Sequence, residues 1–565
     1  MALPNRDGAR RHSAIGQILT GLRHGAVTVT DDLENTTTFG YLFPNLVKDA
    51  DKHLPVDDPP TVVANLTALG EAMADVNPAF GEFGESNDST IPAVYTYLGQ
   101  FVDHDLTAAT DRDNPDVGTV TDDNLHPADP DLIVQKLHNA RFPALNLDSL
   151  YGDGPTFDPD DPTAAQDFYD GIKLKVGQVQ KLGQNIAKKI PLEGDLDRDL
   201  PRTPTGATPA EKRVARIGDG RNDENLIIAQ LHVAFLRFHN AVVAQVRAGS
   251  GPEATDEDVF TEAQRLVRWH YQWIVLHDYL PTIALPGVVD KVLSDPANLL
   301  VTAVGQRGDD EPTFMPLEFA TAGFRFGHSM VRAVYDFNRN FGRGAAAGAT
   351  FAQLFQFTGT GGFLPAATAT KLPSNWIVEW DRFTEFDPRF PDRFSRRIDT
   401  NLADPLFDMK NQIAGIDPPP SPTVAHVLKH LAVRNLRRGY LLSLPTGQAV
   451  AAELGLDALT EDELLHDTTS KVAVALQKGG FLERTPLWFY LLKEAEVRAG
   501  GNSLGEVGST IVAQTLVGQL RLDPGSYLNV QPGWVPEDGV RLSDGRGVRT
   551  IKDLFRVAGV FPVRP

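Results

Sequence analysis

The 565-residue chain contains no cysteine, which excludes disulfides, thiolate metal ligands and cysteine nucleophiles. It also lacks a long hydrophobic run, since no stretch reaches the roughly 18 apolar residues that a membrane-spanning helix needs. Residues 1–12 contain no apolar segment of the kind found in cleavable signal peptides. We therefore expect no membrane span, and a location in the cytoplasm or outside the cell without a cleavable signal. The missing cysteines fit a reducing compartment without proving one.

Positive charge is comparatively scarce. The chain has 53 Lys and Arg residues against 74 Asp and Glu residues, a net charge of −21. A surplus of negative charge repels phosphate backbones and anionic membrane surfaces, so we expect no nucleic-acid partner. No internal repeat at a solenoid period is present. With 42% hydrophobic and 22% charged residues, the composition is that of an ordinary soluble globular protein.

Strand patterns are scarce too, whereas apolar residues recur at helical spacing along most of the chain. We predict a mainly α fold: one large helical domain over residues 61–565 with long loops and little β structure, preceded by an N-terminal arm over residues 1–60. The helices are expected at 61–76, 91–106, 224–246, 255–279, 423–443, 460–477, 488–498 and 504–519. The long loops are expected at 111–131, 152–170 and 342–362.

Four polar side chains interrupt the apolar segment that ends at Leu106: Gln100, Asp103, His104 and Asp105. Gln100 and His104 are four residues apart and share a helical face, whereas Asp105 points roughly the opposite way. Burying unpaired polar groups costs several kcal/mol, so these side chains need partners. Taken alone, the stretch is explained as well by a satisfied core histidine or a polar helix end.

A second cluster, residues 216–225, begins a predicted helix and places Arg221 and Glu224 three residues apart. A capped helix start with a surface ion pair would explain it. Pro281 is expected to end the next predicted helix, 255–279.

Two further clusters lie later in the chain. Residues 322–330 carry Arg325 and His328 within an apolar segment, 312–334, that we expect to be helical. Alone, His328 would be a core histidine. Residues 434–439, which include Asn435, would alone be a solvated helix end.

Together the clusters supply one chemistry. A histidine beside an arginine can cleave a peroxide O–O bond, because the histidine moves the proton between the oxygens while the arginine stabilises negative charge. A second histidine, oriented by a hydrogen-bond acceptor, can ligate haem iron from the opposite side.

Three motifs carry a family resemblance. Residues 99–105 (GQFVDHD) resemble the distal helix of the animal-type haem peroxidases, the peroxidase–cyclooxygenase superfamily that includes myeloperoxidase. Residues 221–224 (RNDE) resemble the family's distal arginine and haem-ester glutamate, and residues 324–328 (FRFGH) its proximal histidine motif. The motifs follow the family's order, the resemblance covers roughly residues 90–530, and the overall pattern resembles that of bacterial members.

The resemblance implies a distal side built from His104 as acid/base and Arg221 as distal arginine. Gln100 would hold water, peroxide or halide near the iron. Asn225 stands where myeloperoxidase has a methionine that forms a sulfonium link, so we expect that link to be absent.

On the proximal side, the resemblance implies that His328 is the axial ligand of haem b, with Asn435 accepting a hydrogen bond from its other ring nitrogen. Arg325 would lie near a haem propionate. Asp103 and Glu224 match the carboxylates that esterify haem methyl groups in mammalian members, and the same esters are a hypothesis here.

A calcium site is implied as well, because Asp105 points away from the haem side toward the family's calcium loop. Its oxygen donors suit calcium. The expected ligands are Asp105, the side chains of Asn146 and Asp148, and the carbonyls of Phe142 and Ala144. The family often has Thr where Phe142 stands, which removes one hydroxyl ligand, and ordinary turn chemistry would also explain Asn146 and Asp148.

The function implied by the resemblance is a haem-dependent peroxidase, with a place in the response to oxidative stress. It would reduce hydrogen peroxide and oxidise phenolic or aromatic donors, or halides, through a ferryl intermediate. A fatty-acid dioxygenase on the same fold is the nearest alternative. Such enzymes carry a tyrosine three residues before the proximal histidine, where this chain has Arg325 followed by Phe326, and neither can form a tyrosyl radical.

The clusters are compatible with two more functions. A non-haem metallohydrolase could use the four polar side chains around His104 as ligands, but it leaves Arg221 and His328 without a role. A non-catalytic haem-binding or adhesion protein would not need the pair formed by His104 and Arg221. The histidines on long apolar helices are assigned to core or surface structure without a functional role: His232, His239, His270 and His277.

Overall fold

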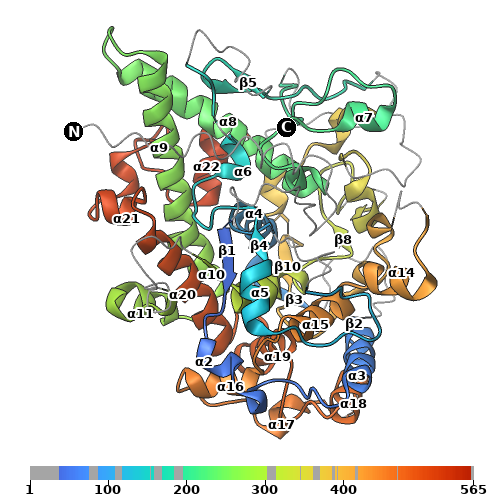
Figure 1. Ribbon diagram of the computed structural model, residues 1–565. Helices are drawn as coiled ribbons and strands as arrows, with labels where there is room; N and C mark the ends of the chain where they lie inside the picture. The colour runs from blue at the N-terminus through green and yellow to red at the C-terminus, as the bar shows by residue number, and fades with distance from the viewer. Residues whose placement is uncertain are drawn as a thin grey trace.

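Helix α4 (Val94–Leu106) lies near the centre of the structure, a computed structural model (Figure 1). The structure describes residues 37–75, 87–108, 117–152, 154–157, 168–182, 195–301, 314–343, 345, 347–359, 369–384, 389–390, 392–413, 418–467 and 469–561. Helices surround one continuous hydrophobic core, which confirms the predicted mainly α fold. Residues 1–36 of the predicted arm, and most of the predicted loop 152–170, lie outside the described residues, and the domain division at residue 60 stays a prediction.

Helix α4 begins three residues later than the sequence predicted. The preceding residues form β3 (Asp88–Pro92), which pairs with β10 (Phe394–Arg396), so Pro92 ends a strand instead of opening a helix. Nine of the 13 residues of α4 are buried, which identifies it as an interior helix. Its polar side chains must therefore be paired within the protein.

Two long helices pack beside α4 in the order that the sequence predicted. Helix α8 (Leu226–Gly249) is capped by Asn225, whose side chain accepts from two backbone N–H groups. Helix α9 (Asp256–Ile274) opens with the capping box of Thr255 and Asp258 and packs along α8. Helix α8 is long and apolar enough to cross a membrane by length and composition, but 83% of its apolar window is buried within the protein, as in a core helix.

The prediction that Pro281 ends this helix is wrong. The chain widens into a π-helical segment, η6 (Val275–Tyr279), and continues as α10 (Leu280–Ile283). Pro281 lies in the first turn of α10, where a missing N–H removes no essential hydrogen bond.

The predicted helix over 312–334 is also wrong. Its described part forms the two-residue strand β7 (Met315–Pro316), the short helix α13 (Leu317–Thr321) and the 3₁₀ helix η8 (Gly323–His328). Glycines at both 323 and 327 lower the preference for an α-helix. Because a 3₁₀ helix has three residues per turn, Arg325 and His328 lie one above the other.

The opposite side of the core is formed by helices from the last third of the chain: α15 (Leu431–Leu441), α19 (Leu487–Ala499) and α20 (Glu506–Leu522). The predicted helix 423–443 is two helices, because His430 is extended between α14 (Pro422–Lys429) and α15. The ring of His430 accepts from Val433 N and caps α15. Helix α3 (Pro59–Ala72), predicted at 61–76, packs on α15.

The remaining elements are short. The remaining α-helices are α2 (Pro44–Val47), α5 (Pro130–Lys136), α6 (Asp148–Tyr151), α7 (Pro209–Arg213), α11 (Val288–Ser294), α16 (Gly447–Glu453), α17 (Glu461–Leu464), α18 (Lys471–Lys478), α21 (Tyr527–Val530) and α22 (Ile551–Val557). The strand β1 (Thr37–Gly40) runs antiparallel to β4 (His138–Asn139) and parallel to β7. The two-stranded pairs are β2 (Ala74–Asp75) with β11 (Leu402–Ala403), β5 (Tyr169–Asp170) with β6 (Lys173–Leu174), and β8 (Val334–Tyr335) with β9 (Ala349–Thr350).

Candidate active site

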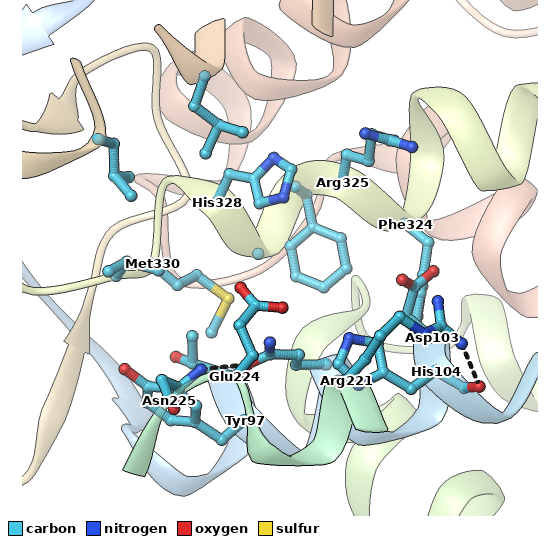
Figure 2. Close-up of a pocket in the computed structure, with 18 of the residues that line it drawn as sticks. Tyr97, Asp103, His104, Arg221, Glu224, Asn225, Phe324, Arg325, His328 and Met330 are labelled. Atoms are coloured by element: carbon cyan, nitrogen blue, oxygen red, sulfur yellow. Dashed lines mark hydrogen bonds between the residues drawn. The ribbon is translucent and has the colours of Figure 1, made fainter. Parts of the chain in front are cut away.

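A cavity of about 1400 Å³, counting the solvent at its mouth, lies between α4 and η8. The 3₁₀ helix η5 (Gly220–Asp223) and the start of α8 complete the wall formed by α4, and α15 completes the wall formed by η8. Figure 2 shows His104 and Arg221 on one wall and His328 on the other. All eight residues predicted for a haem pocket line this cavity: Gln100, Asp103, His104, Arg221, Glu224, Arg325, His328 and Asn435. Clusters that are far apart in the sequence thus meet at one place.

The His104 imidazole is held in a defined orientation. Its Nδ1 lies 2.9 Å from Asn222 Oδ1, and because that oxygen can only accept, Nδ1 carries the ring proton. The Nε2 lone pair is then the acceptor that the ring can offer to the cavity. Burial, reinforced by the charge of Arg221, lowers the pKa of His104 to about 4. The ring is therefore a neutral base at ordinary pH.

Arg221 is fixed by a buried carboxylate. Its Nη2 and Nε donate to Asp219 at 2.7 and 3.1 Å, and Nη2 also donates to the backbone oxygen of His104 at 2.8 Å (Figure 2). Arg141 donates to the same carboxylate at 2.5 Å. Burial alone would raise the pKa of Asp219, but the two arginines hold it well below its usual range. The charges of both arginines are thus shared with one buried anion.

Gln100 reaches the cavity from the same wall. Its Oε1 accepts from Asn225 Nδ2 at 3.1 Å, while Asn225 Oδ1 caps α8. In the described part of the chain, the amide nitrogen of Gln100 has no hydrogen-bond partner, so it can donate to a small polar ligand in the cavity. Asn225 therefore both orients the Gln100 side chain and caps the N-terminus of α8.

The His328 ring stands on the opposite wall, at the end of η8, with the Trp488 ring 6.5 Å away. Asn435 Nδ2 lies 2.8 Å from His328 Nδ1, and Asn435 Oδ1 accepts from Arg325 Nη1 at 3.2 Å. The predicted contact is present. In this structure the amide donates to the ring, the reverse of the direction implied for a haem-ligated histidine, which stays a prediction. The reason is that a guanidinium can only donate, so Arg325 takes the amide oxygen and leaves the nitrogen to the histidine.

Asp103 and Glu224 both line the cavity, and Figure 2 shows the Glu224 carboxylate extending from its wall toward the element that carries His328. Asp103 Oδ1 accepts from Thr107 Oγ1 at 2.9 Å, and the Thr107 hydroxyl also donates to the Asp103 carbonyl. Both carboxylates thus lie at the cavity surface, which is the position that an ester to a bound group would require.

The predicted calcium loop lies beside Asp105, as the sequence indicated. Asp105 Oδ2 accepts from Leu147 N at 3.0 Å, and Oδ1 accepts from the backbone and hydroxyl of Ser149 at 3.3 and 3.2 Å. Burial and the neighbouring Asp148 carboxylate raise the pKa of Asp105 to about 7. A cation would relieve that repulsion, so the donor chemistry fits calcium.

The oxygens of three other predicted calcium ligands already accept hydrogen bonds from backbone N–H groups of the loop. The carbonyls of Phe142 and Ala144 accept backbone hydrogen bonds at 2.8 and 2.9 Å, and Asn146 Oδ1 accepts from Asp148 N at 3.1 Å. Among the described residues, no group of three or more His, Cys, Asp or Glu side chains is placed to hold a metal. Calcium here would depend on carbonyl and amide oxygens for most of its coordination.

The sequence did not predict that Asp219 pairs with Arg221, or that Asn222 joins His104 to His232. Asp219 lies two residues before Arg221, but its second partner, Arg141, comes from 78 residues earlier, a separation at which no sequence pattern signals a contact. Asn222 lay inside a recognised cluster. Its position between an arginine and two acidic residues was the available signal.

Comparisons with known proteins find similarity to peroxidases. A family model described as animal haem peroxidase matches residues 170–355, a region that contains Arg221 and His328 but not His104 or Asn435. A peroxidase-like protein of Margaritifera margaritifera is 28% identical over 260 residues, covering 43% of this chain and 32% of that protein. Heme peroxidase 2 of Caenorhabditis elegans is 23% identical over 325 residues, covering 56% of this chain and 40% of that protein. The chain thus spans less than half the length of these relatives.

Solved structures show the same fold. Peroxidase A from Dictyostelium discoideum matches with a TM-score of 0.53 and 15% identity, over 94% of both chains. A fatty acid alpha-dioxygenase from Oryza sativa matches with a TM-score of 0.50 and 12% identity, over 98% of this chain and 87% of that one. At such identities the likeness concerns the fold alone.

Proposed function

Because the chain belongs to the animal haem peroxidase family, we propose that it is a haem-dependent peroxidase that reduces hydrogen peroxide and oxidises small electron donors. The observation that carries the proposal is the neutral His104 beside Arg221, on the wall opposite His328. A protein that only carries haem needs no such pair.

The proximal residues would hold the haem. His328 offers Nε2 to the iron, and bound haem supplies the metal centre that takes up the oxidising equivalents of the peroxide. Ligation through Nε2 leaves the ring proton on Nδ1, which then needs an acceptor. A haem propionate near Arg325 would compete with the Asn435 oxygen for that guanidinium. The amide can then turn by 180° and accept from Nδ1–H.

The distal residues would move the proton. His104 Nε2 takes the proton from the inner oxygen of hydrogen peroxide and returns it to the outer oxygen, so that water leaves as the O–O bond breaks. Arg221 stabilises the negative charge that develops on the departing oxygen. Gln100 donates through its amide nitrogen and holds water, peroxide or a halide in place.

The donors are proposed to be phenolic or aromatic molecules, or halides. Ester links from Asp103 and Glu224 to the haem, and calcium at the loop beside Asp105, are further proposals. Support for the esters is the position of both carboxylates at the cavity surface, and support for calcium is the closeness of the Asp105 and Asp148 carboxylates.

A fatty-acid dioxygenase is the alternative, since this fold also serves an alpha-dioxygenase. The residue three positions before His328 is Arg325, which cannot form a tyrosyl radical. Two assays on the purified haem-loaded protein separate the functions. We expect peroxide-dependent oxidation of guaiacol and no oxygen uptake with linoleate. Rapid oxygen uptake with linoleate in the absence of peroxide would reverse the assignment.

A further inference from the structure

A buried chain of three polar side chains leads away from the cavity. His104 Nδ1 lies 2.9 Å from Asn222 Oδ1, and Asn222 Nδ2 lies 3.0 Å from His232 Nδ1. The exposed fractions of the three residues are 2%, 0% and 0%, so water does not compete for these hydrogen bonds. His232 comes from α8, whereas His104 comes from α4 and Asn222 from η5.

The direction of the chain follows from the Asn222 amide. Its oxygen can only accept, so His104 carries its proton on Nδ1. Its nitrogen can only donate, so His232 Nδ1 has a lone pair and the proton of that ring lies on Nε2. Burial lowers the pKa of His232 to about 3, which keeps the ring neutral and the Nδ1 lone pair free to accept.

His232 differs from the other buried histidines of the helical core. His239, on the same helix, uses both ring nitrogens, one with the Tyr151 hydroxyl and one with the Ile172 carbonyl. His270 likewise binds two backbone groups, of Val540 and Val548. These rings hold separate segments together. In the described part of the chain, His232 Nε2 has no hydrogen-bond partner, and the only polar contact of the ring is with Asn222.

We propose that His232, acting through Asn222, is a positioning residue that fixes the tautomer of His104. Asn222 couples the two tautomers: while His232 Nδ1 carries a lone pair, the amide nitrogen faces α8 and the amide oxygen faces His104. If the amide turned by 180°, both rings would change tautomer together. His104 would then present an Nε2–H to the cavity and could not accept the peroxide proton. The proton pattern stands on the geometry alone, whereas its catalytic consequence rests on the proposed function.

Neutron diffraction from crystals of the haem-loaded protein, exchanged into D₂O, tests the pattern directly. We expect deuterium on His104 Nδ1 and on His232 Nε2. Deuterium on His104 Nε2 together with His232 Nδ1 would overturn the proposal. The measurement does not depend on turnover, so a protein that lacked peroxidase activity would defeat the proposed function and still decide this inference.

Variants test the consequence. In His232→Phe the buried Asn222 N–H loses its acceptor, which favours the turned amide, so the rate constant for reaction with hydrogen peroxide should fall by about tenfold. His232→Asn can place a side-chain oxygen near the former Nδ1, because both atoms are bonded to Cγ, and should stay within about threefold of the wild-type rate constant. His239→Phe, an equally buried substitution on the same helix, should react as the wild type does. A wild-type rate for His232→Phe, or a rate for His232→Asn as low as that of His232→Phe, would contradict the assignment.

Discussion

Removing the charge of Asp219 should destabilise the protein far more than removing the charge of a surface carboxylate. Asp219 is 0% exposed and pairs with Arg221 and Arg141, whose side chains are 6% and 3% exposed. Asp219→Asn preserves the shape but leaves both guanidinium groups buried without a counter-charge. Breaking a buried ion pair by removing one partner costs about 3–5 kcal/mol, so we expect a loss of that size in the free energy of unfolding.

Urea denaturation followed by tryptophan fluorescence and far-UV circular dichroism measures the loss, with Glu262→Gln as the matched control. Glu262 pairs with Arg265 at the surface, where the two side chains are 43% and 35% exposed, so the control should lose less than about 1 kcal/mol. Asp219→Asn should also react more slowly with peroxide, because Arg221 loses its anchor. Equal stability losses in the two variants would refute the claim that Asp219 organises this wall.

Three further predictions concern the site. His104→Gln should slow the reaction with hydrogen peroxide by about 10² or more, measured by stopped-flow absorbance, and a near-wild-type rate would remove His104 from the mechanism. Because His104 must be neutral to act as a base and its pKa is lowered to about 4, the rate constant should stay level from about pH 5 upward and fall as the pH drops through about 4. A fall beginning near pH 6.5 would show an unshifted imidazole. If Asp103 and Glu224 form esters, acid–acetone will leave haem on the protein, whereas complete extraction would count against the esters.

The polar clusters could be predicted from the sequence because each gathers charged, amide or imidazole side chains within or beside an apolar segment, where they must find partners. Gln100, His104 and Arg221 accordingly meet at one cavity. Local spacing could not reveal which groups they pair with, because those contacts depend on tertiary structure. Asp219 joins Arg141, and Asn222 joins two histidines on different helices.

The remaining differences have the same origin. The amide of Asn435 turns its oxygen to Arg325, a neighbour brought there by η8 and α15, and no local pattern in the sequence signals that contact. The helix break at His430 and the continuation past Pro281 are also set by context. His430 is extended and its side chain caps α15, and the π-helical segment η6 carries the backbone into α10. Local propensity does not predict either conformation.

The central claim is that His328 ligates haem iron while His104 faces the oxidant. Titrating the haem-free protein with hemin, and recording the absorption spectrum before and after one equivalent of hydrogen peroxide, tests it most directly. We predict a stoichiometric Soret band that shifts within seconds of peroxide addition. In His328→Ala the ferric band should be altered before peroxide is added, whereas in His104→Gln it should form normally and shift slowly. A protein that binds no hemin, or a His328→Ala variant with the wild-type spectrum, would contradict the account.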